Sequence, residues 1–346
     1  MLTVEETKKY NRQIKLEGFG TSSQEKLKDA KVLVVGLGGL GSPISFYLAA
    51  SGVGTLGLIE FDKVDISNLS RQILYCENEI GNLKLDIAVE KLSKLNSNIK
   101  IVPFKERLTK KNGDEILSQF SLIIDGSDNF ETRYLVNDIC VKLGIPLVHG
   151  SVSGFEGFIS LFNLKSISPC YRCLYPVIPN NGSGCSEAGV LPTVAGLVGV
   201  QMAHECIKIL TGCGDNLDGK VLFLRKNNFE TFNLKKDPDC PICGSGKILD
   251  KKNFQELTLD EFNKIKNQTE VIDIREEAEF KELNLGGTNI PFTTFEIGKI
   301  AHLKEKELII ICYSGERSKA ILEILKNNNF RKIFNLKGGI REAILN

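Results

Sequence analysis

The chain of 346 residues contains ten cysteines, and four of them stand in two C-x-x-C pairs. The pairs are Cys170/Cys173 and Cys240/Cys243. Each pair closes a tight turn, and four thiolates make a tetrahedral zinc site without an open position, so we predict a structural Zn²⁺ site. Disulfides and a redox C-x-x-C are the alternatives, although the chain starts without a secretory signal and neither pair opens a thioredoxin-like helix.

Another cysteine, Cys312, directly follows the apolar run 308–311 and opens the segment Cys-Tyr-Ser-Gly-Glu-Arg317 before a helix. A loop of this form turns its N–H groups toward the thiol, and a helix N-terminus favours the thiolate. The same cradle would stabilise the terminal sulfur of a persulfide, with Arg317 assisting anion binding. Four residues separate Cys312 from Arg317; the rhodanese resemblance given below implies that this is the loop size of sulfurtransferases, whereas cysteine phosphatases have a wider loop. A buried, inert Cys312 is the alternative.

Cys185 lies in a segment of small residues, Asn181-Gly-Ser-Gly-Cys-Ser186, that could carry a thiol to a substrate. A bystander cysteine on a loop is the alternative. The remaining thiols have no comparable setting, and we expect them to act as small hydrophobic residues: Cys76, Cys140, Cys206 and Cys213. The three histidines, His149, His204 and His302, are not spaced as metal ligands, so we expect packing or hydrogen bonding from them.

A glycine-rich motif, Gly36-Leu-Gly-Gly-Leu-Gly41, stands between a β-branched run and an apolar helical segment. Glycines allow a tight turn and close approach of backbone, and the helix N-terminus offers N–H groups to phosphate. An acidic residue about 20 positions later, Glu60 or Asp62, is suited to a ribose hydroxyl. We therefore predict nucleotide binding by Gly36, Gly38, Gly39, Gly41, Glu60 and Asp62, with a ligand-free turn as the alternative.

Further polar residues favour a triphosphate over a nicotinamide at this site. Asn68, Arg71 and Lys84 follow the second strand, and Asp128 and Asn129 follow a later one. Ligands of open α/β sheets bind at the carboxyl ends of the strands, so these side chains are expected to converge there. ATP with Mg²⁺ needs cations for the phosphates and a carboxylate for the metal. Solvated surface charges are the alternative.

The elements that must position these residues alternate between strands and helices, which predicts an α/β fold with a Rossmann-like, mostly parallel, doubly wound sheet. A smaller α/β domain follows. We predict domains at 1–247 and 254–346, joined by a linker at 248–253. The expected strands are 31–35, 55–59, 121–125, 145–149, 270–274, 307–311 and 332–335, and the expected helices are 5–28 with a break near Gly18–Gly20, 43–50, 84–95 and 319–326.

Composition excludes several partner classes. With 44 basic and 43 acidic side chains, the net charge of +1 gives no reason to expect nucleic acid or an anionic membrane. The most apolar window, 188–203, is short for a membrane span and contains Pro192, Gly196 and Gly199. The first residues lack the apolar run of a secretory signal, so we expect a cytoplasmic protein.

Residues 1 to about 247 resemble the MoeB/ThiF family, the bacterial relatives of ubiquitin-activating enzymes. The matching stretches are Tyr10-Asn-Arg-Gln-Ile14, Gly36-Leu-Gly-Gly-Leu-Gly41, Ser67-Asn-Leu-Ser-Arg-Gln72, Asp128-Asn129 and Glu187-Ala-Gly-Val-Leu-Pro192. The resemblance implies adenylation of the C-terminal glycine of a ubiquitin-like sulfur carrier by ATP and Mg²⁺. Gly39 and Gly41 would contact the nucleotide, and Asn68, Arg71 and Lys84 would hold the phosphates. Asp128 would hold Mg²⁺ and assist adenylation.

Three further implications come from this resemblance. Arg12 would reach the active site of a neighbouring protomer, which implies a homodimer. Cys185 would form a transient covalent link to the carrier, and zinc would occupy the paired cysteines. Glu60 stands where the family usually has the ribose-binding Asp, so one methylene separates the two.

Residues 254–346 resemble the rhodanese family. Besides the Cys312 loop, the matches are Asp273-x-Arg275, Asn289-Ile-Pro291 and Leu336-Lys-Gly-Gly-Ile340. The family often has His before the segment that ends at Pro291, and this chain does not.

These expectations combine into one hypothesis. The chain would adenylate a sulfur carrier ending in Gly-Gly, and a Cys312 persulfide would then convert the adenylate to a thiocarboxylate. The sulfur donor is open, a cysteine desulfurase being one candidate, as is the pathway, among molybdopterin, thiamine and tRNA thiolation. An NAD-dependent oxidoreductase, a non-catalytic sulfur-relay or carrier-docking scaffold, and an activating enzyme for another substrate are the alternatives.

Overall fold

The computed structural model describes residues 1–176, 189–225, 228–244, 255–292, 295, 297–313, 315–328 and 330–341. Cys185 and the predicted linker at 248–253 lie outside them. The chain divides into two compact units, one made of 1–174 and 182–247, the other of 175–181 and 248–346. The predicted domain boundaries stay a prediction, because they fall in the undescribed stretch.

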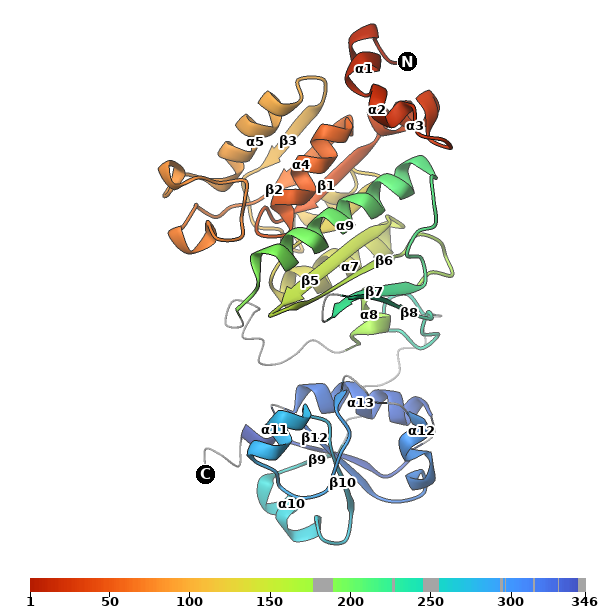
Figure 1. Ribbon diagram of the computed structural model, residues 1–346. Coiled ribbons are helices and arrows are strands. Elements are labelled where there is room, and N and C mark those ends of the chain that lie inside the picture. Colours follow the sequence, from red (N-terminus) through yellow and green to blue (C-terminus); the bar gives the residue numbers. More distant parts are fainter. Residues whose placement is uncertain are drawn as a thin grey trace. The chain divides into compact units, whose positions relative to one another are not determined.

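The first unit is built on an eight-stranded sheet in the order β3-β2-β1-β4-β5-β6-β7-β8 (Figure 1). Its strands are β1 (Lys31–Val35), β2 (Thr55–Ile59), β3 (Lys100–Phe104), β4 (Leu122–Asp125), β5 (Leu147–Ser153), β6 (Glu156–Phe162), β7 (Lys220–Arg225) and β8 (Asn228–Asn233). The five strands from β3 to β5 in this order (β3, β2, β1, β4 and β5) are parallel. Strands β6, β7 and β8 continue the sheet in antiparallel fashion.

The apolar composition of β1, β2 and β4 follows from their burial. Residues 32–35, 56–59 and 122–125 are buried, as expected for parallel strands covered on both faces. The chain leaves β1 through β2 to β3 on one side and returns to β4 on the other side. A crevice therefore forms at the carboxyl ends of β1 and β4, where the order of the strands reverses.

Helices of the first unit cover both faces of this sheet, and α1 and α2 pack on other helices. They are α1 (Val4–Lys9), α2 (Asn11–Ile14), α3 (Gly20–Asp29), α4 (Gly41–Ser51), α5 (Lys84–Leu95), α6 (Gly113–Leu117), α7 (Phe130–Leu143), α8 (Tyr171–Leu174) and α9 (Pro192–Thr211), with short 3₁₀ helices η1 (Ile66–Asn68) and η2 (Glu77–Glu79). In Figure 1, α4 and α9 lie in front of the sheet and α7 lies behind it.

The helical segment predicted over 5–28 has the predicted break near Gly18 and, before it, an unpredicted one at Tyr10, so it forms three helices. Tyr10 explains the first break, because its side chain is fixed by tertiary contacts. Its hydroxyl accepts a hydrogen bond from Asn96 Nδ2 at 2.8 Å, and its ring packs so closely on Gly52 that a Cβ there would lie 2.5 Å away. The turn at Tyr10 thus depends on residues more than 40 positions distant, which helical periodicity does not reveal.

Helix α9 is longer than the apolar window suggested, and in the described part of the chain it is the helix with the length and composition to cross a membrane. Its packing gives another reason for its apolar character. It lies against α4, β5 and β6, and a Cβ on Gly199 would lie 2.5 Å from Pro43 Cγ. Glu205 within it is fully buried and pairs with Lys208. We conclude that α9 is a core helix.

The second unit has a five-stranded parallel sheet in the order β11-β10-β12-β13-β9. The strands are β9 (Gln255–Leu257), β10 (Glu270–Asp273), β11 (Thr288–Asn289), β12 (Leu308–Ile311) and β13 (Ile333–Leu336). The helices are α10 (Leu259–Ile265), α11 (Glu277–Glu282), α12 (Ile297–Ile300) and α13 (Glu316–Asn327), with the 3₁₀ helix η4 (Ala301–Leu303). Two buried clusters cover the two faces of the sheet, and the central strand β12 ends directly before Cys312.

Candidate functional site

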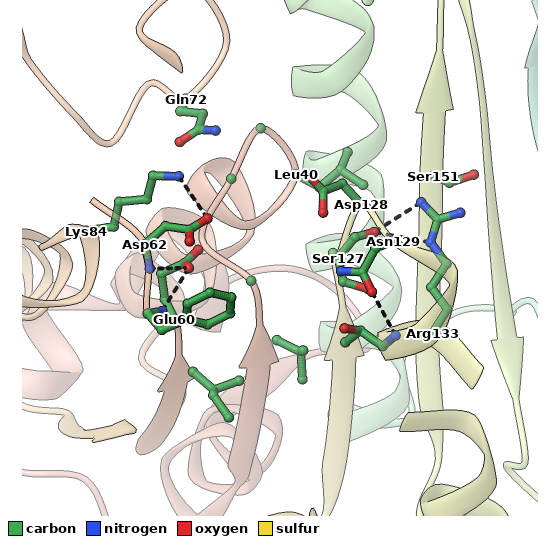
Figure 2. A pocket seen from close by; sticks show the side chains of 18 of the residues that line it. Leu40, Glu60, Asp62, Gln72, Lys84, Ser127, Asp128, Asn129, Arg133 and Ser151 are labelled. Carbon is green, nitrogen blue, oxygen red and sulfur yellow. Dashed lines mark hydrogen bonds and ion pairs between the residues drawn. The ribbon is translucent and has the colours of Figure 1, made fainter. Parts of the chain in front are cut away.

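A pocket lies at the carboxyl edge of the parallel strands, at the switch point between β1 and β4 (Figure 2). Gly36 follows β1, Glu60 follows β2, and Gly126 to Asn129 follow β4. Nine of the predicted nucleotide-site residues line it: Gly36, Gly38, Gly39, Glu60, Asp62, Arg71, Lys84, Asp128 and Asn129. Gly41, Asn68 and Arg12 are not among the lining residues.

The glycine loop is closed by backbone contacts. Gly36 has a positive φ of 82°, and a Cβ on Gly41 would lie 2.0 Å from the Gly36 carbonyl oxygen. Both backbone polar groups of Leu37, which lies between them, are hydrogen-bonded. Its N–H donates to Glu60 Oε2 at 3.0 Å, and its carbonyl accepts from the Tyr75 hydroxyl at 3.0 Å. Gly41 therefore shapes the loop from below the pocket, a packing role that needs the absence of a side chain.

Glu60 is a backbone anchor of the site. The carboxylate is buried, and besides Leu37 it accepts hydrogen bonds from the N–H groups of Phe61 at 2.9 Å and Asp62 at 3.1 Å. The Glu60 side chain, which is one methylene longer than that of the family's usual Asp, thus joins the end of β2 to the glycine loop. Its predicted contact with ribose stays a prediction.

Two cations flank the pocket with little compensation from acidic groups. Lys84 is 6% exposed, and its ion pair is with the exposed Asp62 at 3.8 Å. Arg71 donates to the Ser67 carbonyl at 2.9 Å, and its Cγ would be 3.5 Å from a Cβ on Gly39. An anionic ligand would stabilise the charge of a buried ammonium whose single acidic partner is distant. This arrangement is suited to phosphate groups over the glycine loop.

Asn68 supports Arg71 from outside the pocket. Its carbonyl accepts hydrogen bonds from the N–H groups of Arg71 and Gln72 at 3.1 and 2.9 Å, and its side chain accepts from the Asp65 N–H at 3.2 Å. Its predicted contact with phosphate stays a prediction. Arg12 lies exposed on α2, away from this pocket, so it would need a second protomer to act as predicted.

The loop after β4 carries the acidic side of the pocket. Asp128 is exposed to the pocket, and the Asn129 side chain caps α7 by accepting from the Thr132 N–H at 2.9 Å. Arg133 in the first turns of α7 is buried and donates from Nε and a terminal nitrogen to the Ser127 carbonyl at 3.2 and 3.1 Å. A carboxylate beside a phosphate-binding loop is a fitting ligand for Mg²⁺.

Below this loop, Asp125 and His149 form a buried pair. The Asp125 carboxylate bonds His149 Nδ1 at 2.9 Å and accepts from the Ser127 N–H at 3.0 Å. Burial would raise the pKa of Asp125, but the bonds to His149 and Ser127 bring it below its usual value. Burial lowers the pKa of His149, with Asp125 opposing and Arg133 reinforcing the shift. The expectation of hydrogen bonding and packing by His149 agrees with this geometry.

Sequence reasoning missed several residues that line the pocket, namely Gln72, Glu106, Arg107, Arg133 and Ser151. Gln72 directly follows Arg71, and its buried Oε1 has no partner among the described residues. Arg107 lies over the Phe61 ring, 4.9 Å from its centroid. The available signal was strand β3, which was not predicted: its carboxyl end leads to Glu106 and Arg107.

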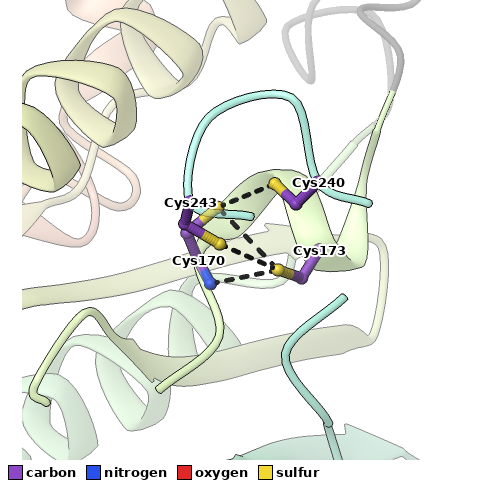
Figure 3. A group of neighbouring side chains, drawn as sticks. All are labelled: Cys170, Cys173, Cys240 and Cys243. Atoms are coloured by element: carbon purple, nitrogen blue, oxygen red, sulfur yellow. Dashed lines mark hydrogen bonds between the residues drawn. The ribbon is translucent and has the colours of Figure 1, made fainter. Parts of the chain in front are cut away.

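The two C-x-x-C pairs come together in the first unit (Figure 3). Their four sulfur atoms lie within 4.8 Å of one another, with separations of 3.6 Å for Cys170–Cys240, 3.9 Å for Cys170–Cys173 and 3.4 Å for Cys173–Cys243. A tetrahedral zinc with Zn–S bonds of about 2.3 Å places its sulfur ligands about 3.8 Å apart. The donor set and its spacing therefore fit Zn²⁺.

Cys312 occupies the predicted cradle in the second unit. Its thiol is fully buried, accepts from the Gly315 N–H at 3.1 Å and lies 3.4 Å from the Ser318 hydroxyl. The hydroxyl also lies 2.6 Å from Asn335 Oδ1. The thiol thus has one backbone donor and one hydroxyl group within reach, both able to stabilise negative charge on sulfur.

Arg317 is paired rather than free at the end of this loop. Its two terminal nitrogens bond both carboxylate oxygens of Glu279, on α11, at 3.2 and 3.0 Å. The Asp273-x-Arg275 motif is fixed at the end of β10 by polar contacts. Arg275 pairs with Asp273 at 2.7 Å, and Asn289 Nδ2 donates to the backbone carbonyls of Asp273 and Arg275, each at 2.9 Å. Assistance by Arg317 in anion binding stays a prediction.

Comparisons with known proteins cover both units. Residues 10–242 match the model of the ThiF family, and residues 258–344 match the model of the rhodanese-like domain. The chain is 35% identical over 374 residues to the adenylyltransferase and sulfurtransferase of Meyerozyma guilliermondii, covering 98% of this chain and 88% of that protein.

Other relatives match the first unit. The sulfur carrier protein adenylyltransferase of Thermus thermophilus is 43% identical over 250 residues, 70% of this chain and 92% of that protein. Among solved structures, E. coli MccB with succinimide has the same fold, with a TM-score of 0.60 and 24% identity over 68% of this chain and 73% of that chain. This chain therefore belongs to the ThiF family and carries a rhodanese-like domain in its C-terminal part.

Proposed function

We propose that this chain adenylates the C-terminal glycine of a ubiquitin-like sulfur carrier protein with ATP and then sulfurates it to a thiocarboxylate. The observation that carries the proposal is the presence, in one chain, of a cationic pocket at the switch point of the sheet and a cradled Cys312 thiol. The names of the Thermus and Meyerozyma relatives support both activities.

The first step takes place over the glycine loop. The carrier's terminal carboxylate attacks the α-phosphate of ATP, forming an acyl-adenylate and releasing pyrophosphate. Arg71 and Lys84 line the pocket and would offset the developing negative charge, with Arg12 of a second protomer adding another cation. Asp128 would hold Mg²⁺, which supplies further charge neutralisation at the phosphates.

The second step moves sulfur. Cys312 takes a sulfane sulfur from a donor and holds it as a persulfide. The Cys185 thiolate displaces AMP from the carrier to form a thioester, and the terminal persulfide sulfur then attacks that thioester and releases Cys185. Two equivalents of an external thiol reduce the resulting acyl disulfide and leave as their own disulfide, which frees the thiocarboxylate and returns Cys312 as a thiol.

The connectivity of the chain supports a role for Cys185. Val190 lines the ATP pocket, and the neighbouring Gly189 carbonyl accepts a hydrogen bond from the Gly154 N–H at 2.8 Å. Five positions separate Cys185 from Val190. In the sequence, Cys185 is therefore close to a residue that lines the pocket.

We further propose a homodimer and a structural zinc at the four paired cysteines. Leu197 and Val200, three positions apart on α9, are 51% and 38% exposed, and Tyr47 on the neighbouring α4 is 52% exposed. Exposed apolar side chains on adjoining helices suit an interface with a second copy of the chain. A cytoplasmic location is part of the same proposal, because reduced thiols are needed for both zinc and persulfide chemistry.

The test uses purified full-length chain and a sulfur carrier ending in Gly-Gly. We expect carrier-dependent exchange of pyrophosphate into ATP, and sulfur transfer from thiosulfate to cyanide. Cys312→Ala should abolish sulfur transfer and leave the exchange intact. Absence of exchange would overturn the adenylation step; retained carrier binding would then indicate a scaffold, and tight NAD binding without ATP binding an oxidoreductase.

A further inference from the structure

The short helix α8 carries part of the zinc cluster and is too short to hold its own shape. It spans Tyr171–Leu174, directly after Cys170, and contains Cys173. An isolated helix of one turn is unstable in water, so its conformation depends on what holds its ends and side chains. The four clustered thiols and the neighbouring helix α7 are the two features that do so here.

Helix α8 is bound firmly to the middle of α7. The Tyr171 N–H donates to Asn137 Oδ1 at 2.7 Å, and Arg172 makes a two-pronged ion pair with Asp138, both N–O distances being 2.7 Å. Arg172 also lies over the Tyr134 ring, 4.6 Å from its centroid. Any displacement of α8 therefore strains contacts on α7.

The start of α7 forms one wall of the ATP pocket. Asn129 caps this helix, and Thr132 and Arg133 in its first turns line the pocket. Arg133 and Asn137 are four positions apart, one helical turn or about 6 Å along the axis. The residues that hold the zinc helix and those that line the pocket thus belong to consecutive turns of the same helix.

A second connection runs through the buried pair beneath the pocket. The Tyr171 ring packs edge-on against His149, with 4.8 Å between centroids. His149 bonds Asp125, and Asp125 accepts from the Ser127 N–H in the loop that leads to Asp128. Both connections end on the same β4–α7 loop, one through the helix and one through side chains.

We propose that occupancy of the cysteine cluster by Zn²⁺ and binding of ATP are thermodynamically coupled, because α8 fixes the position of α7 and its preceding loop. The proposal rests on the proposed function for the identity of both ligands. If zinc favours the α7 position that ATP needs, ATP must favour zinc by the same factor. The metal-bound cluster then positions residues of the nucleotide site, in addition to holding α8 next to the second cysteine pair.

The experiment compares ATP affinity of zinc-loaded protein and protein stripped of zinc by a chelator, by calorimetric titration. We expect the dissociation constant for ATP to rise at least about fivefold on stripping, the lower end of usual coupling between sites. The reciprocal measurement, chelator competition for zinc with and without saturating ATP, should show ATP raising zinc affinity by the same factor. Far-ultraviolet circular dichroism checks that the stripped protein stays folded.

Two matched variants locate the connection. Arg172→Ala breaks the ion pair from α8 to Asp138, whereas Lys142→Ala breaks an ion pair from the same helix α7 to Asp114 on α6. In Arg172→Ala, we expect zinc to change the ATP dissociation constant by less than about twofold. In Lys142→Ala, we expect the same change as in the wild type.

The outcomes separate this proposal from the proposed function. Failure of zinc-loaded protein to bind ATP would overturn the proposed function. Normal ATP binding by zinc-loaded protein, with a zinc affinity that ATP leaves unchanged, would overturn the coupling alone. Because the competition measurement starts from zinc-loaded protein, it gives a result even where the stripped chain unfolds.

Discussion

At the scale of residues, the two thiol sites differ in what surrounds the sulfur. The paired cysteines face one another, which suits a metal, whereas Cys312 faces a backbone N–H and the Ser318 hydroxyl. The hydroxyl proton has Asn335 Oδ1 and the Gly315 carbonyl as further acceptors. It can turn to the sulfur when the thiol ionises, which makes Ser318 a positioning residue for the persulfide.

Ser318→Ala should therefore slow alkylation of Cys312 by iodoacetamide about tenfold at neutral pH. A hydrogen bond to a charged group is worth roughly 1.5 kcal/mol or more, and about 1.4 kcal/mol corresponds to a factor of ten. Mass spectrometry of the Cys312 peptide measures the rate. Ser318→Thr keeps the hydroxyl and should restore the wild-type rate; a slow Thr variant would mean that Ser318 acts through packing.

The buried His149 predicts a loss of stability on the acid side of neutrality. Burial holds the pKa of His149 below its usual 6.5, so below pH 6.5 the unfolded chain takes up a proton that the folded chain refuses. The unfolded state is then favoured, by up to about 1.4 kcal/mol per pH unit until the lower folded pKa is reached. The depressed pKa of Asp125 adds its own loss at still lower pH.

Urea denaturation between pH 7.5 and 5.5 measures this slope. His149→Asn retains an amide donor for Asp125 and should flatten the slope, whereas His204→Asn, at an exposed position of α9, should leave it unchanged. An unaltered slope in His149→Asn would contradict the assignment.

At the scale of elements, the packing of α9 on α4 holds the glycine loop in place. A Cβ on Gly199 would lie 2.7 Å from the Leu40 carbonyl and 2.5 Å from Pro43 Cγ, whereas one on Gly196 would meet nothing within 4 Å. Leu40 directly precedes Gly41, so a shift of α4 would move the loop.

Gly199→Ala should therefore lower the free energy of unfolding by about 1–3 kcal/mol and weaken ATP binding. Gly196→Ala in the same helix should be neutral or stabilising by up to about 1 kcal/mol, because alanine favours helix over glycine. Urea denaturation and nucleotide titration test both variants. Equal stabilities would show that α4 and α9 adjust to the extra methyl group.

The elements that the sequence revealed share a clear physical signal. Strands β1, β2 and β12 are continuous apolar runs buried on both faces, and the structure has them at or within one residue of the predicted bounds. The antiparallel strands β6, β7 and β8 of the first sheet were not predicted. Strand β8 is exposed along its length, and β3 is only partly buried, so neither shows a core pattern.

The candidate site was predictable where motif and strand end coincide. Lys84, Arg71 and Asp128 were found because each follows a recognisable strand or motif. Gln72, Arg107 and the Asp125–His149 pair were not assigned to it, since their contribution depends on side chains brought together across separate strands. The pairing of Arg317 with Glu279 was likewise hidden, because it joins positions 38 residues apart.

At the scale of the whole molecule, the proposed homodimer makes the adenylation site depend on a second chain. Arg12 does not line the pocket of its own chain, and the exposed apolar residues of α9 and α4 offer the contact surface. A single variant that disrupts the proposed interface therefore tests both the dimer and the contribution of Arg12 to the partner's pocket.

Leu197→Asp should convert the dimer to a monomer in sedimentation velocity and reduce pyrophosphate exchange by at least tenfold, because the partner's cation is lost. Leu283→Asp, at a 40% exposed apolar position of the second unit, is the matched control and should leave both properties unchanged. A wild-type chain that sediments as a monomer while retaining full exchange would refute the dimer requirement.

The spacing of the cysteine cluster has a consequence for biosynthesis. Cys170 and Cys240 are neighbours in the folded chain yet 70 positions apart. At about 5–20 residues per second, the ribosome releases the second pair roughly 4 to 14 seconds after the first. During that interval every strand that lines the nucleotide pocket has already been made, but the cysteine cluster has only two of its four thiols. Capture of the proposed Zn²⁺ by all four thiols would therefore be a late event in synthesis, after the emergence of α9 and β7.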